Sequence, residues 1–158
     1  MTDAAEEQDD EVLRWVTFEL EKETYGINVS DVREVLRFSE IAPVPGAPSY
    51  VIGIINLRGN VVTVIDTRKR FGLGPKEVDD LTRIVIIEID GQEVGILVDS
   101  VAEVVDLKMS DIEPAPNVGN EDTSRYITGV TSRNGELLII VDLKKILSAE
   151  ELQDVAMF

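Results

Sequence analysis

The chain has 158 residues, of which 31 are acidic and 15 are basic, and its formal net charge is −16. A chain of this length forms one domain or two small ones, and it can bury about 70% of the surface that the unfolded chain exposes. The negative charge argues against nucleic acid as a partner, because the protein would repel a phosphate backbone. Without histidine and cysteine, the chain lacks an ordinary general base, a thiol nucleophile and a soft metal site. We therefore expect neither a metal nor a cofactor.

Residues 1–11 form an acidic segment with six carboxylates and no side chain suited to a core. This composition predicts a disordered tail. The segment has neither the basic nor the apolar part of an export signal, and no later apolar run approaches the roughly 20 residues of a membrane span. We therefore expect a cytoplasmic protein that does not insert into the membrane.

The next elements follow from alternation and from turn-forming residues. Residues 12–28 predict a β-hairpin, because apolar and polar side chains alternate on both sides of a polar turn. Ser30 is suited to cap a short helix with Val32 and Val35 on its apolar face. The proline-rich residues 43–48 can neither continue a helix nor join a central ladder, so they predict a bend at a barrel edge.

Residues 53–66 predict a second hairpin, in which two β-branched runs flank the turn pair Arg58-Gly59. Apolar side chains occupy both faces of its strands, so we expect both faces to be buried. Packing of one barrel against another explains this pattern, and so does contact with an external partner. A helical turn at 67–71 and a polar connector at 74–80 end the first half of the chain.

The second half of the chain repeats the pattern of the first. Residues 129–142 align with residues 53–66 without a gap, at a spacing of 76 (129 − 53). The other matches keep the same order along the chain, which predicts an internal duplication of about 70 residues. They pair Tyr25-Gly26-Ile27 with Val94-Gly95-Ile96, Pro43-Val44-Pro45 with Pro114-Ala115-Pro116, and Tyr50 with Tyr126.

The duplication predicts an all-β fold of two packed barrels, each with about five short strands, joined by short helices. We expect the first barrel at 12–80 and the second at 81–147. Residues 148–158 are expected to form a C-terminal helix, because Ser148-Ala149-Glu150-Glu151 is a capping box.

Several motifs together resemble the CheW family of bacterial chemotaxis coupling proteins, and they cover nearly the whole chain from Phe18 to Leu147. The resemblance implies two SH3-like five-stranded barrels and a non-enzymatic adaptor that joins the cytoplasmic tips of chemoreceptors to the histidine kinase CheA. It also implies a place at receptor arrays on the inner membrane face, a monomeric free state, and a stand-alone member of the family. The motifs are Asn56-Leu57-Arg58-Gly59, Val64-Ile65-Asp66, Arg70-Phe71-Gly72, Tyr25-Gly26-Ile27, Val32-x-Glu34-Val35 and Pro114-x-Pro116.

The resemblance also implies roles for particular residues. The second kinase contact lies in a loop without the arginine and aromatic side chains that would serve as anchors. The implied sites are Val32, Glu34 and Arg58 for the receptor, Ile41 and Val44 for the kinase regulatory domain, and Glu113 to Val118 for a second kinase interface.

Other interpretations compete with these roles. Judged by periodicity alone, Val32 and Val35 belong to a core rather than to a contact surface. The chain could also be an adaptor of another chemosensory pathway, such as pilus motility or development, or a small barrel that binds a ligand. The ligand-binding alternative is disfavoured, because barrels of five short strands are filled by their own side chains.

Arg58 stands out when the two hairpin copies are compared. The second copy has Asn134-Gly135, the preferred pair for a two-residue turn with positive φ angles, whereas the first has Arg58-Gly59. A non-glycine residue in the left-handed region costs about 1 to 2 kcal/mol, and asparagine tolerates it better than arginine. The sequence therefore predicts that Arg58 is strained without local gain and serves to grip a partner.

Overall fold

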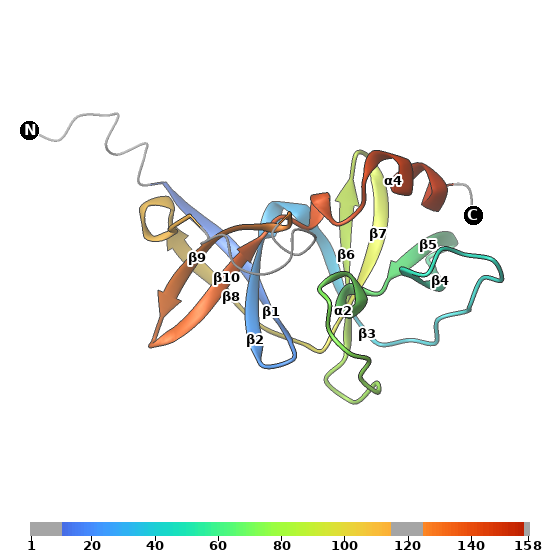
Figure 1. Cartoon of the computed structure of the whole chain (residues 1–158), viewed down its shortest axis with the longest axis horizontal. Coiled ribbons are helices and arrows are strands. Elements are labelled where there is room, and N and C mark those ends of the chain that lie inside the picture. Colours follow the sequence, from blue (N-terminus) through green and yellow to red (C-terminus); the bar gives the residue numbers. More distant parts are fainter. Residues whose placement is uncertain (1–10, 115–124, 157–158) are drawn as a thin grey trace, which may run out of the picture.

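The computed structural model describes residues 11–114 and 125–156, and it contains two five-stranded sheets that form two neighbouring lobes (Figure 1). The predicted all-β class is confirmed. Sheet A has the strand order β8 (Ser100–Lys108), β1 (Val12–Leu20), β2 (Glu23–Asn28), β10 (Glu136–Val141), β9 (Ile127–Arg133). Sheet B has the order β3 (Val32–Arg37), β6 (Arg83–Ile89), β7 (Gln92–Val98), β5 (Asn60–Ile65), β4 (Val51–Leu57).

Each sheet combines strands from both halves of the sequence. The hairpin β1–β2 pairs with β8 and β10 of the second half, and the hairpin β6–β7 pairs with β3 and β5 of the first half. The predicted barrels at 12–80 and 81–147 are therefore corrected, because neither range contains a complete sheet. The repeat in the sequence shows only the order of the elements. It does not reveal whether a hairpin pairs within its own half or with the other half. The residues 1–10 of the predicted tail lie outside the described residues.

Short helical elements connect the sheets. The α-helix α2 (Thr67–Arg70) follows β5, as the sequence predicts, and the predicted capping box opens the C-terminal helix α4 (Ala149–Ala156). In this box, the Ser148 amide donates to Glu151 Oε1 at 2.9 Å and the Glu151 amide donates to Ser148 Oγ at 3.1 Å. The described residues also form three 3₁₀ turns, at Val29–Asp31, Met109–Asp111 and Leu143–Lys145.

The predicted short helix after Ser30 is wrong, since Val32–Arg37 is strand β3. A six-residue helix gains little stability on its own, whereas a strand in this place pairs with β6 along its length. A register shift between Val32 and Glu34 places Val32 and Val35 opposite Ile87 and Val85, on the face toward the other sheet, and it places Glu34 on the opposite face. Val35 is nevertheless 40% exposed, whereas Val32 is half-buried.

Neither sheet closes into a complete barrel through a strand ladder, so the predicted barrels are open sheets. In each sheet a single bridge joins the segment after one edge strand to the opposite edge strand. Ala42 and Ile54 exchange two backbone hydrogen bonds of 2.9 Å, and Glu113 and Val130 exchange two of 2.8 Å. Gly53 and Gly129, which are equivalent in the two halves, lie at these bridges. Glycine is required there because a Cβ atom on Gly53 would lie 2.2 Å from the Ala42 carbonyl oxygen.

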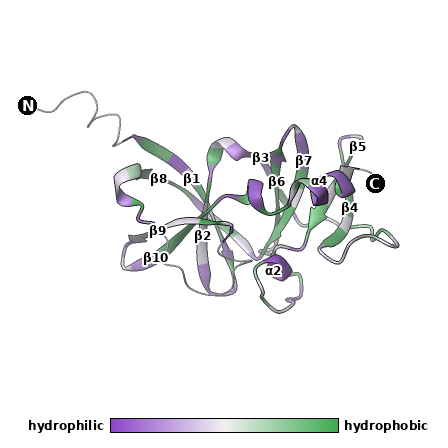
Figure 2. Cartoon of the chain, turned by 45° about the horizontal axis from the view of Figure 1, so that its top comes forward, coloured by the Kyte–Doolittle hydropathy of each residue, from purple (hydrophilic) through white to green (hydrophobic). Residues whose placement is uncertain are grey.

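The core has three parts, which explains why the hairpin β4–β5 is apolar on both faces. One cluster fills sheet A, a second fills sheet B, and the largest lies between the two sheets. On β5, Val62 and Val64 belong to the interior of sheet B, while Ile65 belongs to the cluster between the sheets. Hydrophobic residues accordingly run through the strands of both lobes in Figure 2. The interior of sheet B therefore buries one face of this strand, and packing of one sheet against the other buries Ile65 on the opposite face.

Candidate functional site

The structure brings Glu34 and Arg58 together at one end of sheet B. Glu34 lies at an irregularity in the pairing of β3 with β6, and Arg58 lies at the tip of the hairpin β4–β5. Arg58 Nη1 donates to Glu34 Oε1 at 3.2 Å, and Nη2 donates to Oε2. The Arg58 side chain is 67% exposed and that of Glu34 is 29% exposed, so the pair is accessible to a partner.

The hairpin tip has the backbone conformation that the sequence predicts. The φ angle of Arg58 is 52° and that of Gly59 is 88°, and the equivalent residues Asn134 and Gly135 have φ angles of 54° and 81°. The prediction of left-handed residues in both copies is therefore confirmed. The prediction that Arg58 has no local gain is wrong, because its guanidinium makes a two-pronged contact with Glu34.

The other predicted contact residues of sheet B are half-buried. Val32 is half-buried and packs against the cluster between the sheets. Ile41 and Val44 are also half-buried, and Ile41 packs against the core of sheet B. They flank Ala42, whose backbone bridge to Ile54 draws this segment against the sheet.

The predicted second kinase interface is described only at its start. Glu113 is exposed, and its backbone forms the bridge to Val130 at the edge of sheet A. Val118 lies outside the described residues. Glu113 is therefore held in place by the fold, and its carboxylate remains accessible.

Sequence reasoning missed a buried junction around Arg68. The guanidinium donates to the Gly74 carbonyl oxygen at 2.6 Å, to Asp99 Oδ2 at 2.6 Å, and to Glu21. Burial alone lowers the pKa of Arg68, but the hydrogen bonds that it donates to Glu21 and Asp99 outweigh this effect and raise that pKa. Because Glu21 lies in the turn after β1 and Asp99 lies between β7 and β8, this junction fixes sheet A against sheet B. No motif in the sequence pairs these residues.

A second contact holds helix α4 against the lobe of sheet B. Arg70 pairs with Glu151, and its guanidinium carbon lies 4.2 Å from the centre of the Tyr50 ring. Burial alone raises the pKa of Glu151, but hydrogen bonds from Ser148 and Arg70 outweigh it and lower that pKa. The first-half tyrosine and the C-terminal helix are thereby joined in one rigid surface.

The described residues offer no metal centre, since no group of three or more histidine, cysteine or carboxylate side chains among them is arranged to hold an ion. In the same part of the chain, we find no helix with the length and apolarity needed to cross a membrane.

The ion pair at the hairpin tip predicts a measurable pH effect. The hydrogen bond from Arg58 lowers the pKa of Glu34 below its usual value. The contribution of this pair to stability is therefore present above the pKa of unfolded Glu34 and is lost as the pH falls through the folded-state pKa. We expect Arg58→Asn to raise the Glu34 pKa, measured by NMR titration of its side-chain carboxyl carbon. An identical titration curve in the variant would show that the two side chains do not interact in solution.

Comparisons with known proteins agree with the fold. A model of the family described as CheW-like domain matches residues 14–151. The chain is 34% identical to "Chemotaxis protein CheW" of Treponema pallidum over 93% of this chain and 89% of that protein. It is 36% identical to "Chemotaxis protein CheW" of Bacillus subtilis over 89% of this chain and 90% of that protein.

A solved structure shows the same architecture. The crystal structure of the scaffolding protein TtCheW from Thermoanaerobacter tengcongensis superposes with a TM-score of 0.81 and 37% identity. The alignment covers 89% of this chain and 96% of that one. The resemblance found in the sequence is thereby confirmed, and the chain belongs to the family of CheW-like chemotaxis proteins.

Proposed function

We propose that this chain is a non-enzymatic adaptor that couples the cytoplasmic tips of chemoreceptors to a CheA-type histidine kinase, at receptor arrays on the inner membrane face. Membership of the CheW-like family gives the chain its place as a chemotaxis scaffold. The observation that carries the finer proposal is the exposed Glu34–Arg58 pair on a rigid hairpin tip. A preorganised charged pair suits recognition of a partner, because little side-chain freedom is lost on binding.

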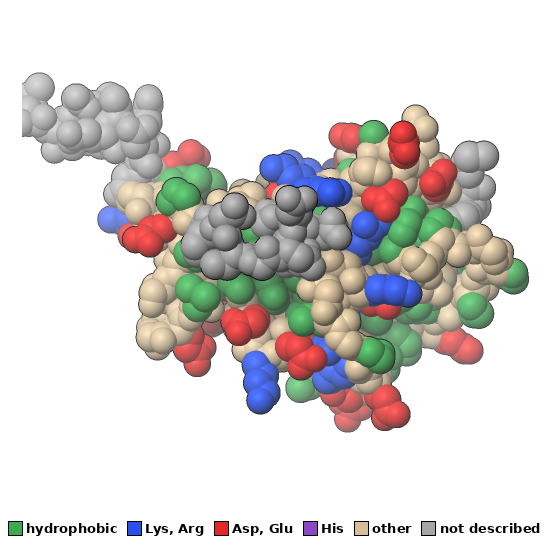
Figure 3. Space-filling view, in the orientation of Figure 1, with side chains coloured by type: hydrophobic (Ala, Val, Ile, Leu, Met, Phe, Trp, Pro, Cys, Tyr) green, Lys and Arg blue, Asp and Glu red, His purple; other side chains and the backbone are tan. Residues whose placement is uncertain are grey.

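The receptor surface is proposed to consist of Val32, Glu34 and Arg58. The guanidinium of Arg58 and the carboxylate of Glu34 offer donors and acceptors side by side, which suits polar side chains on a helical partner. Exposed valines lie close in sequence to both residues, at Val35 and Val61. Figure 3 shows one face of the molecule, where charged side chains of both signs lie among apolar ones. Such mixed surfaces are typical of non-obligate protein interfaces.

The kinase contacts are proposed at two bridge segments. Ile41 and Val44 flank the bridge that ends sheet B, and Glu113 lies in the bridge that ends sheet A. Their backbones are fixed by hydrogen bonds, so a partner meets them in one conformation. Binding of an isolated kinase regulatory domain in a pull-down tests this part of the proposal. Absence of binding at tens of micromolar would overturn it.

Arg58→Asn is expected to separate receptor coupling from stability. Exposed ion pairs contribute little to stability, and asparagine adopts the left-handed conformation at a lower cost than arginine. The melting temperature should therefore stay equal or rise slightly, while receptor-dependent kinase activity falls. Both quantities are measured on the same variant, with receptors in membrane vesicles.

A matched control for this experiment is Lys145→Asn, which removes the same charge from an exposed residue. We expect this control to keep full receptor coupling. A clear fall in melting temperature for Arg58→Asn with unchanged coupling would make Arg58 a structural residue.

A further inference from the structure

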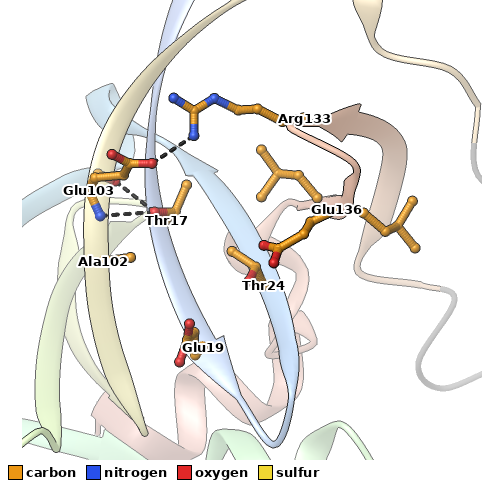
Figure 4. Close-up of a pocket in the computed structure, with 9 residues that line it drawn as sticks. Thr17, Glu19, Thr24, Ala102, Glu103, Arg133 and Glu136 are labelled. Atoms are coloured by element: carbon orange, nitrogen blue, oxygen red, sulfur yellow. Dashed lines mark hydrogen bonds and ion pairs between the residues drawn. The ribbon is translucent and has the colours of Figure 1, made fainter.

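The duplication places a second glutamate–arginine pair at the end of sheet A. Glu103 of β8 occupies the position of Glu34, at a spacing of 69 (103 − 34), and Arg133 precedes the turn of the hairpin β9–β10. Arg133 Nη1 lies 2.6 Å from Glu103 Oε1. Beside this pair is a recess of about 130 Å³, whose lining includes Thr17, Glu19, Thr24 and Ala102 (Figure 4). We call it the sheet A recess.

The strand pairing shows that the two sites are structurally equivalent. In sheet B, Val32 pairs with Ile87 and Val35 pairs with Val85, with a register shift between them. In sheet A, Val101 pairs with Phe18 and Val104 pairs with Val16, again with a register shift between them. Each of the four residues named in sheet B lies 69 positions from its counterpart in sheet A. The residues of the recess can therefore be compared one by one with those of sheet B.

This comparison reveals one missing cation. In sheet B, the guanidinium of Arg33 pairs with the carboxylate of Glu88. In sheet A, Glu19 keeps the position of Glu88 (88 − 69), but Ala102 stands in place of Arg33 (33 + 69). Glu19 instead accepts a hydrogen bond of 3.1 Å from the Ser100 hydroxyl. The first copy thus shows how this backbone holds a guanidinium, and the second copy keeps the acceptor and leaves the space open.

The rest of the recess is prepared for a cation. The charge of Glu103 is balanced by Arg133. Glu136 also lines the recess, on the side opposite Glu103, and adds a second negative charge to that of Glu19 (Figure 4). The floor is fixed, because the Thr17 hydroxyl donates to the Glu103 carbonyl oxygen at 2.8 Å and accepts from the Glu103 amide at 3.0 Å. In sheet B the position of Thr17 is taken by the fully buried Ile86. Sheet A therefore replaces an apolar filling with hydroxyl-lined space.

We propose that the sheet A recess receives the arginine side chain of a protein partner, at a docking surface separate from Glu34 and Arg58. Its volume of about 130 Å³ suits one side chain, whereas pockets for small-molecule ligands usually exceed about 300 Å³. The aliphatic part of the arginine packs along Ala102 and Leu138, and the guanidinium reaches Glu19. Leu137, which is 51% exposed at the rim, adds an apolar contact for the surface around that arginine.

The test is an NMR titration of the intact chain with N-acetyl-arginine-N-methylamide, whose only charge is the guanidinium. We expect saturable amide shifts at Thr17, Glu19 and Glu103 with a millimolar dissociation constant, and at least about fivefold weaker binding of the neutral citrulline analogue. Glu19→Gln should weaken binding by a similar factor. Ala102→Arg should abolish it, because the introduced guanidinium fills the recess as Arg33 does in sheet B.

Arg33→Ala supplies the reciprocal control. It should free Glu88 and create a second set of probe-dependent shifts in sheet B. Equal shifts with the citrulline analogue, unchanged binding by Glu19→Gln, or no shift at about 100 mM probe would overturn the proposal. Micromolar affinity for free L-arginine would indicate a metabolite site and would overturn the assignment to a protein partner. None of these measurements depends on kinase or receptor binding.

Discussion

Replacing Gly53 by alanine is expected to lower the free energy of unfolding by about 3 kcal/mol, because it overpacks the bridge that ends sheet B. The new Cβ atom would lie 2.2 Å from the Ala42 carbonyl oxygen and 2.8 Å from its carbonyl carbon. These are backbone atoms, so they can move away only if the two hydrogen bonds between Ala42 and Ile54 lengthen or break. Chemical denaturation of the variant, followed by circular dichroism, measures the loss.

Two further variants test this explanation. Gly129→Ala places its Cβ atom 2.6 Å from Ile112 Cγ2 and 2.7 Å from the Glu113 carbonyl oxygen, so we expect a similar but smaller loss. Gly74→Ala is the matched control, since no atom lies within 4 Å of its added Cβ. It should change stability by no more than about 0.5 kcal/mol. If Gly53→Ala were as stable as this control, the close approach at the bridge would not exist in solution.

Local features of the fold could be predicted from the sequence where one residue type satisfies a specific requirement of the backbone. The capping box at Ser148 formed because its serine and glutamate satisfy amide groups that any helix start leaves free. The left-handed turn at Arg58 was predictable from its gapless alignment with Asn134-Gly135. These inferences required only neighbouring residues or a second copy of the same element.

Features that depend on distant residues could not be predicted in this way. Arg68 meets Glu21 and Asp99 only because α2 lies against turns from two other parts of the chain. The pairing of Arg58 with Glu34 is likewise set by the approach of the β4–β5 hairpin to β3. An acidic chain contains many carboxylates with which an arginine could pair, so the sequence alone does not identify the partner of a given arginine.

The exchange of hairpins between the halves predicts that neither half folds alone. A fragment of residues 12–80 contains β1 and β2 of sheet A but lacks the three strands that complete that sheet. It also contains β3, β4 and β5 of sheet B without the central hairpin β6–β7. Two-stranded pieces are marginal in water, and the apolar faces of these strands would be exposed. We expect the fragment to show no cooperative thermal transition.

Mixing the two fragments should restore the fold. This result would show that each fragment alone is unfolded because its sheets lack strands, and not because its own strands pair weakly. Residues 81–156 supply β8, β9 and β10 to sheet A and β6 and β7 to sheet B, so together the fragments contain every strand of both sheets. A chain cut at a protease site placed between Glu77 and Val78, both exposed in the connector, is the control for the break itself. It should keep its fragments together and melt cooperatively. A cooperative melt of residues 12–80 alone would contradict the exchange, because that fragment would then have found partners for β1 and β2 within its own half.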